Sequence, residues 1–133
     1  MNFAINGSYA PFLYIVLLKA ALFFLQRPHY MRQQGSDRKG ASSNVSATID
    51  IYCNLAAATA GILSWGTWAL VIWIGFRFGI SSGLLFFVAG FLGSMLLPLV
   101  LPIGFIADLA GHLVSVLATP FLVSLIVRSV NLL

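Results

Sequence analysis

Asp108 and His112 are the residues whose chemistry stands out, because they lie four apart in the very apolar stretch LPLVLPIGFIADLAGH, residues 97–112. Side chains four apart share one face of a helix. An ionisable pair in apolar surroundings is typical of a proton relay, an ion site or a buried ion pair. A metal would need further ligands, and the sequence offers only the distant His29 or Asp50 as a third. We therefore expect no metal site.

The same pair also has a purely structural interpretation, in which Asp108 is the N-cap of a helix. Its carboxylate would accept hydrogen bonds from the free N–H groups of Ala110 or Gly111, at the positive end of the helix dipole. His112 would then lie in the first helical turn. Two prolines upstream mark a chain break just before such a helix, so the sequence favours the cap over a functional site.

Other chemically active residues are few. Lys19 lies deep in an apolar run, and we expect its aliphatic stem to carry the ammonium to the nearer end of that run. Cys53 is the only cysteine, which excludes an internal disulfide. His29, which we place in a loop beside Pro28, is a poor candidate for a haem ligand. Because the sequence contains no recognisable catalytic or phosphate-binding motif, we expect neither an enzyme nor a bound cofactor.

The composition indicates which solvent surrounds the chain. Hydrophobic residues make up 60% of the 133 residues and charged residues only 8%, with a mean hydropathy of +1.00. A soluble domain carries roughly 25% charged residues, and a small one cannot bury this much apolar surface. The composition therefore predicts an integral membrane protein whose main partner is the lipid bilayer. The net charge of +4 comes from scattered Lys and Arg residues, so we do not expect nucleic-acid binding.

The apolar blocks predict the number of spans. A helix that crosses the bilayer needs about 20 apolar residues. Blocks of this kind predict spans at about 9–26, 52–74, 83–102 and 109–129, with a polar loop over 27–51. The stretch 84–127 is too long for one crossing, and Pro98, Pro102 and Gly104 mark its break. We expect a single membrane domain over 1–133, an all-α integral membrane protein built as a small polytopic bundle of about four transmembrane helices.

Basic residues predict the orientation of this bundle. Four of them fall in the predicted loop and two on the opposite side: Arg27, Arg32, Arg38 and Lys39, and then Arg77 and Arg128. The positive-inside rule places the loop in the cytoplasm and both termini on the outer side of a cell or inner membrane. Asp108 would face the loop side, where one of the loop arginines could pair with it.

Small residues recur at helical spacing in three of the predicted spans: Ala56, Ala60 and Ser64, then Gly90 and Gly93, then Gly111 and Ser115. Such stripes let helix backbones approach closely, and we expect them to line the interior of this bundle. The series Gly75, Gly79 and Gly83 is expected to provide a turn between the second and third spans. Pro120 predicts a kink within the last span.

These features predict a non-catalytic integral membrane subunit that packs within a larger membrane protein complex and scaffolds or modulates it. Its protein partners would then be other integral membrane subunits. The alternative is a homo-oligomeric small channel, transporter or holin-like pore. In that case copies of the chain are the partners, and Asp108, His112 and Lys19 line the path.

Overall fold

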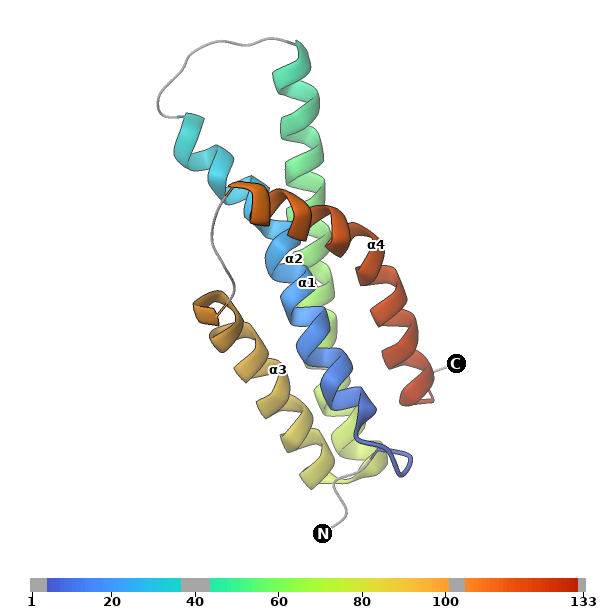
Figure 1. The fold of residues 1–133 in the computed structure, drawn as a ribbon. Coiled ribbons are helices and arrows are strands. Elements are labelled where there is room, and N and C mark those ends of the chain that lie inside the picture. The colour runs from blue at the N-terminus through green and yellow to red at the C-terminus, as the bar shows by residue number, and fades with distance from the viewer. Residues whose placement is uncertain (1–4, 37–43, 101–104, 132–133) are drawn as a thin grey trace.

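The protein is helical over the parts that the computed structural model describes, which are residues 5–36, 44–100 and 105–131. Four helices follow one another: α1 (Ala10–Ser36), α2 (Asn44–Phe78), α3 (Ile80–Val100) and α4 (Phe105–Ser129). They run alternately up and down, so the two termini lie at the same end of the molecule (Figure 1). Three helices are long and apolar enough to cross a membrane, over Ala10–His29, Ala47–Phe78 and Ile106–Ser129, while α3 has a shorter apolar stretch, Ile80–Leu96.

The first two helices are longer than the sequence predicts. α1 continues past Pro28 to Ser36 and α2 begins at Asn44, so both enter the segment 27–51 that was expected to be a loop. His29 accordingly lies in α1 and not in a loop. Once a helix is nucleated, each further residue gains a hydrogen bond, so an apolar helix readily extends into polar sequence. The break expected around Pro102 and Gly104 lies outside the described residues.

α1 is the central helix of the bundle. It packs against α2, α3 and α4, and α2 also packs against α3. In the described ranges, the backbone of α4 approaches neither α2 nor α3. Along the candidate spans, 39% of α1 is buried but only 11% of α2, so α2 turns most of its apolar surface outward.

The hydrophobic core forms around α1. Its apolar side chains recur every three or four residues, which places them on one face of the helix. They meet side chains from the other three helices in a single cluster: Phe12, Ile15, Leu18, Leu22 and Leu25 from α1, with Ala60, Ile74, Phe86, Leu122 and Ile126. The hydrophobic core therefore consists of the surfaces along which α2, α3 and α4 each pack against α1.

Glycines make the connection between α2 and α3. Gly79 has a φ of +102°, a backbone conformation that favours glycine, and its carbonyl accepts the N–H groups of Ser82 and Gly83. The predicted turn is therefore present at Gly79. On either side of it, α2 and α3 approach so closely that a Cβ added at Gly83 would lie 2.7 Å from the Cα atom of Gly75. The three glycines thus join and pack two helices of the same chain.

α4 is bent and tied to the start of the chain. Figure 1 shows the bend near the middle of the helix, and Pro120 accounts for it. The proline ring has no N–H and clashes with the carbonyl of the residue four positions earlier, which kinks a helix. At its end, the carbonyl of Ser129 accepts a hydrogen bond of 2.7 Å from the side-chain amide of Asn6. The bundle is therefore closed at the end where both termini lie.

Candidate functional site

The buried Lys, Asp and His side chains of the described residues contact α1 or belong to it, and they lie at two levels. The upper level, at the end opposite the termini, contains Arg27 of α1 with Asp108 and His112 of α4. The lower level contains Lys19, at the middle of the apolar part of α1. Polar groups inside an apolar bundle need partners, because no water is available to replace a missing hydrogen bond.

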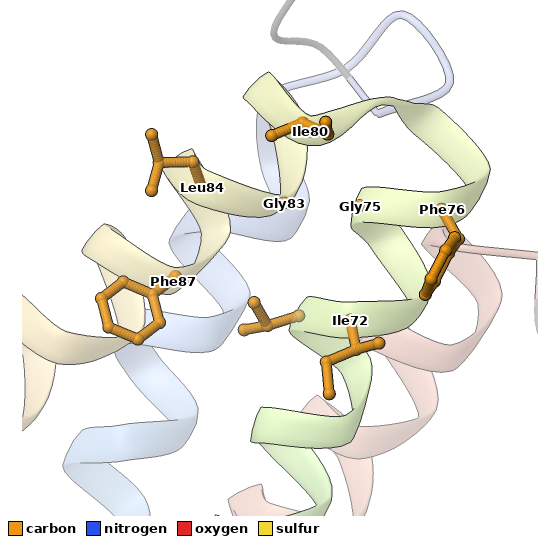
Figure 2. Close-up of a pocket in the computed structure, with 8 residues that line it drawn as sticks. Ile72, Gly75, Phe76, Ile80, Gly83, Leu84 and Phe87 are labelled. Carbon is orange, nitrogen blue, oxygen red and sulfur yellow. The ribbon is translucent and has the colours of Figure 1, made fainter.

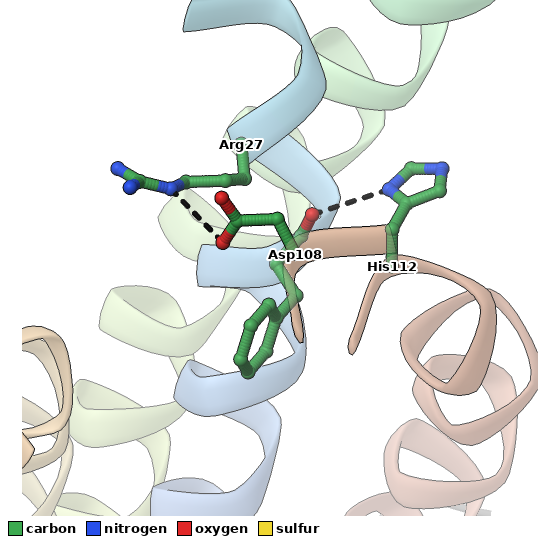
Figure 3. Close-up of polar contacts among 4 residues, drawn as sticks. Arg27, Asp108 and His112 are labelled. Atoms are coloured by element: carbon green, nitrogen blue, oxygen red, sulfur yellow. Dashed lines mark hydrogen bonds and ion pairs between the residues drawn. The ribbon is translucent and has the colours of Figure 1, made fainter. Parts of the chain in front are cut away.

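Arg27 and Asp108 form a buried ion pair. The Nε atom of Arg27 lies 3.2 Å from Oδ1 of Asp108 (Figure 3), and the guanidinium also lies over the ring of Phe23. The side chain of Asp108 is 5% exposed and that of Arg27 25% exposed. Within the described ranges, the second carboxylate oxygen, Oδ2, is buried and has no hydrogen-bond partner. Of the arginines that the sequence placed near Asp108, Arg27 is the one that the structure pairs with it, and the side chains of Arg32 and Arg38 lie outside the described residues.

The expectation that Asp108 is a helix N-cap is wrong. α4 begins at Phe105, three residues earlier, so Asp108 lies within the first turn of the helix. Its negative charge is still favoured near the positive end of the helix dipole. The carboxylate, however, pairs with Arg27 on α1.

His112 links three helices, and its two ring nitrogens have different roles. Nδ1 lies 3.1 Å from the backbone oxygen of Phe24 in α1, and Nε2 lies 2.7 Å from the hydroxyl of Tyr52 in α2. A carbonyl oxygen can only accept, so Nδ1 carries the hydrogen. In the neutral ring Nε2 is then the acceptor and the Tyr52 hydroxyl donates to it. The geometry therefore selects one tautomer of His112.

Pro28 explains why the carbonyl of Phe24 is available. In an α-helix this carbonyl would accept from the N–H of the residue four positions later, which here is Pro28, and proline has no N–H. A carbonyl left without its helical partner in an apolar setting costs free energy. His112 of α4 supplies the missing donor (Figure 3), so the proline in α1 and the histidine in α4 belong to one arrangement.

The sequence predicts that Lys19 extends toward the end of its helix, and this prediction is wrong. Its side chain is 6% exposed, its ammonium donates a hydrogen bond of 3.2 Å to the hydroxyl of Ser64, and it lies 5.2 Å from the ring centroid of Trp68. Gly90 and Gly93 of α3 lie beside the stem, where an added Cβ would be in ordinary contact with Lys19 atoms at 3.8 and 3.5 Å. A hydrogen-bond acceptor and an aromatic ring inside the bundle thus replace the route to the surface.

Most of the predicted small-residue stripes face the interior. Ala60 is fully buried, Ser115 is buried, Ser64 binds Lys19, and Gly90 and Gly93 pack on α1. Gly111 faces the ring of Phe24 so closely that it has no room for a side chain. Ala56 is half-buried and lines a groove between α2 and α4. These residues are packing elements, and two of them also shape the surroundings of Lys19.

The sequence analysis missed Tyr52, Ser64 and the Phe24 carbonyl as members of these polar sites. For the carbonyl a signal existed, because a proline inside a helix frees the carbonyl four residues before it. For Tyr52 and Ser64 the sequence held no such signal, since each meets its partner only through tertiary packing. Among the described residues, no three His, Cys, Asp or Glu side chains lie together as a metal site would require.

No protein-family model, no curated protein and no solved structure matches the chain. The function is therefore inferred from the geometry of the two polar levels and of the exposed helix faces.

We predict that Arg27 and Asp108 are energetically coupled. Arg27→Leu and Asp108→Leu should each lower the free energy of unfolding in detergent by about 1–3 kcal/mol, because each leaves the other charge without its partner. The double variant should recover most of this loss. Asp108→Asn should also destabilise, whereas an N-cap would tolerate it. Arg128→Leu, at the far end of α4, is the control, and strictly additive effects at Arg27 and Asp108 would contradict the coupling.

We predict that the importance of His112 depends on Pro28. With alanine at position 28 a backbone N–H becomes available to the Phe24 carbonyl, so His112→Ala should cost about 1 kcal/mol less in the Pro28→Ala background than in the native one. Thermal or chemical unfolding of the four proteins measures this difference. Tyr52→Phe is the matched control, because it affects Nε2 alone and should cost the same in both backgrounds. An equal cost of His112→Ala in both would show that the histidine does not replace the missing N–H.

Proposed function

We propose that the chain is an integral membrane protein whose four helices all cross the bilayer, and that it is a non-catalytic subunit of a larger membrane assembly. Three helices have the length and apolar character for crossing, and α3, with 21 residues, is about 30 Å long, which matches the hydrocarbon thickness. Large apolar side chains are exposed on every helix, including Leu13, Ile62, Leu84 and Leu117. A bilayer or another membrane protein is the surrounding that suits them.

The single observation that supports a subunit role is the open arrangement of the bundle. Among the described residues, the backbone of α4 approaches that of α1 and of no other helix, and a groove of about 410 Å³ runs between α2 and α4. Tyr52, Leu55 and Thr59 line one wall of this α2–α4 groove and Val116 and Pro120 the other. Helices in membranes associate by close packing of their surfaces, and a groove between two helices is a place where a further helix packs.

The orientation follows from the distribution of basic residues. Arg77 and Arg128 lie in the last turns of α2 and α4, at the end of the bundle where both termini lie. Arg27 lies toward the other end, and the connection from α1 to α2 carries further basic residues. By the positive-inside rule, we place this connection in the cytoplasm and both termini on the opposite side.

A homo-oligomeric channel or transporter is the second candidate. Two observations favour it: Lys19 is buried at mid-helix, and Oδ2 of Asp108 is buried without a hydrogen-bond partner in the part of the chain that the structure describes. Ionisable groups inside membrane helices often mark an ion or proton path. In this case copies of the chain would surround the path, and no other subunit would be required.

Native mass spectrometry after membrane extraction in a mild detergent separates the two candidates. A subunit should be recovered with different proteins at fixed stoichiometry. Thr59→Trp, which fills the α2–α4 groove, should release it, whereas Ile62→Trp, exposed elsewhere on α2, should not. A pure homo-oligomer would contradict the subunit role and support the second candidate. Recovery in the soluble fraction would contradict both.

A further inference from the structure

The ammonium of Lys19 has no charged partner among the residues that the structure describes. In the described residues, its ammonium has the Ser64 hydroxyl and the face of Trp68 as partners, and both are uncharged. The ammonium has three N–H donors, of which Ser64 accepts one. A positive charge in the middle of an apolar span is costly, and such residues usually pair with an opposite charge.

The acidic side chains that the structure describes are too far away to be that opposite charge. They are Asp50 and Asp108. Asp108 is paired with Arg27, which lies eight residues, or about 12 Å, along α1 from Lys19. Asp50 lies about 21 Å along α2 from Ser64. A second copy of the chain brings the same two described carboxylates.

An apolar groove lies between α2 and α3, and one of its lining residues, Phe87, contacts the Trp68 ring that faces Lys19. This α2–α3 groove has a volume of about 490 Å³, with Ile72 and Phe76 on one wall and Ile80, Leu84 and Phe87 on the other (Figure 2). Gly75 and Gly83 form its floor, where their backbones are in contact. A floor without side chains between two walls of large apolar side chains allows another helix to approach closely.

The inner end of the α2–α3 groove is separated from the ammonium by two aromatic side chains. Phe87 lines the groove, and its ring centroid lies 5.2 Å from that of Trp68. The Lys19 ammonium lies 5.2 Å from the same Trp68 ring. For an acidic side chain to reach the ammonium from the groove, the Phe87 ring, which is exposed, must turn outward.

From the charge of Lys19 and the adjacent groove, we propose that the α2–α3 groove receives a membrane helix of a different protein, and that an Asp or Glu at the middle of that helix pairs with Lys19. This inference rests on the subunit role proposed above and specifies the chemistry of the partner. A helix fits better than a small anion, because the groove is lined by apolar side chains. Close packing of a helix against these side chains supplies an attraction that a free anion would lack. A second copy does not fit, because its described acids, Asp50 and Asp108, lie at other depths.

Synthetic membrane helices test this proposal. The full-length protein, labelled with a donor fluorophore at its amino terminus, is reconstituted into phosphatidylcholine vesicles with acceptor-labelled Leu/Ala helices of about 20 residues. The helices carry Glu, Gln or Leu at the central position. The Glu helix should associate about tenfold more tightly than the Gln helix, because it alone brings a charge to Lys19. Lys19→Met, which keeps a straight side chain without charge, should abolish this preference.

Groove variants provide the controls. Leu84→Trp fills the α2–α3 groove and should weaken binding of the Glu helix, whereas Leu117→Trp, exposed on α4, should leave it unchanged. Equal association of the Glu and Gln helices, or a preference that survives Lys19→Met, would overturn the proposal. Equal weakening by both tryptophan variants would also overturn it, because binding would not be at this groove. If foreign subunits are still recovered by native mass spectrometry, the subunit role stands although this inference has failed.

Discussion

The structure depends on one constraint: α1 is the central helix of an apolar bundle, yet its packed part carries Lys19, Arg27 and Pro28. Each of these leaves a polar group that must be satisfied by a side chain from another helix. Lys19 finds Ser64 of α2, Arg27 finds Asp108 of α4, and the carbonyl freed by Pro28 finds His112 of α4. Apolar packing alone has no direction, whereas these three contacts fix which face of α2 and α4 is turned toward α1.

The same contacts explain why an open arrangement can be stable. Over the described ranges the backbone of α4 approaches only that of α1, but α4 is held at one end by Asp108 and His112 and at the other by the bond between Asn6 and the Ser129 carbonyl. Tyr52 links α2 to α4 through His112, although the two backbones do not approach each other. This side-chain bridge spans the groove between α2 and α4 at the end that Tyr52 lines.

Sequence patterns predicted some levels of this organisation and not others. The apolar blocks identified the helices, and the small residues Ala60, Gly90 and Gly93 were correctly expected inside the bundle, since both properties are local in sequence. The segment 27–51 was predicted to be a loop, but α1 and α2 both extend into it. Polar residues allow a helix as well as a loop, so the sequence did not indicate where these helices end. The predictions that Asp108 caps a helix and that Lys19 extends outward were wrong, because the side chains that bind these two residues are distant in sequence. Arg27 is 81 residues from Asp108, and Ser64 is 45 from Lys19.

His112 of α4 joins α1 and α2 through hydrogen bonds of its two ring nitrogens, and this arrangement is central to the structure. The tautomer of His112 tests it most directly. ¹⁵N NMR of ring-labelled protein in bilayers, at a pH where the histidine is neutral and with His112→Asn to assign the signals, reports which nitrogen carries the hydrogen. The account predicts a protonated Nδ1 and an unprotonated Nε2, with the Nε2 signal shifted in Tyr52→Phe. A hydrogen on Nε2, or a ring that averages between the two tautomers, would contradict it.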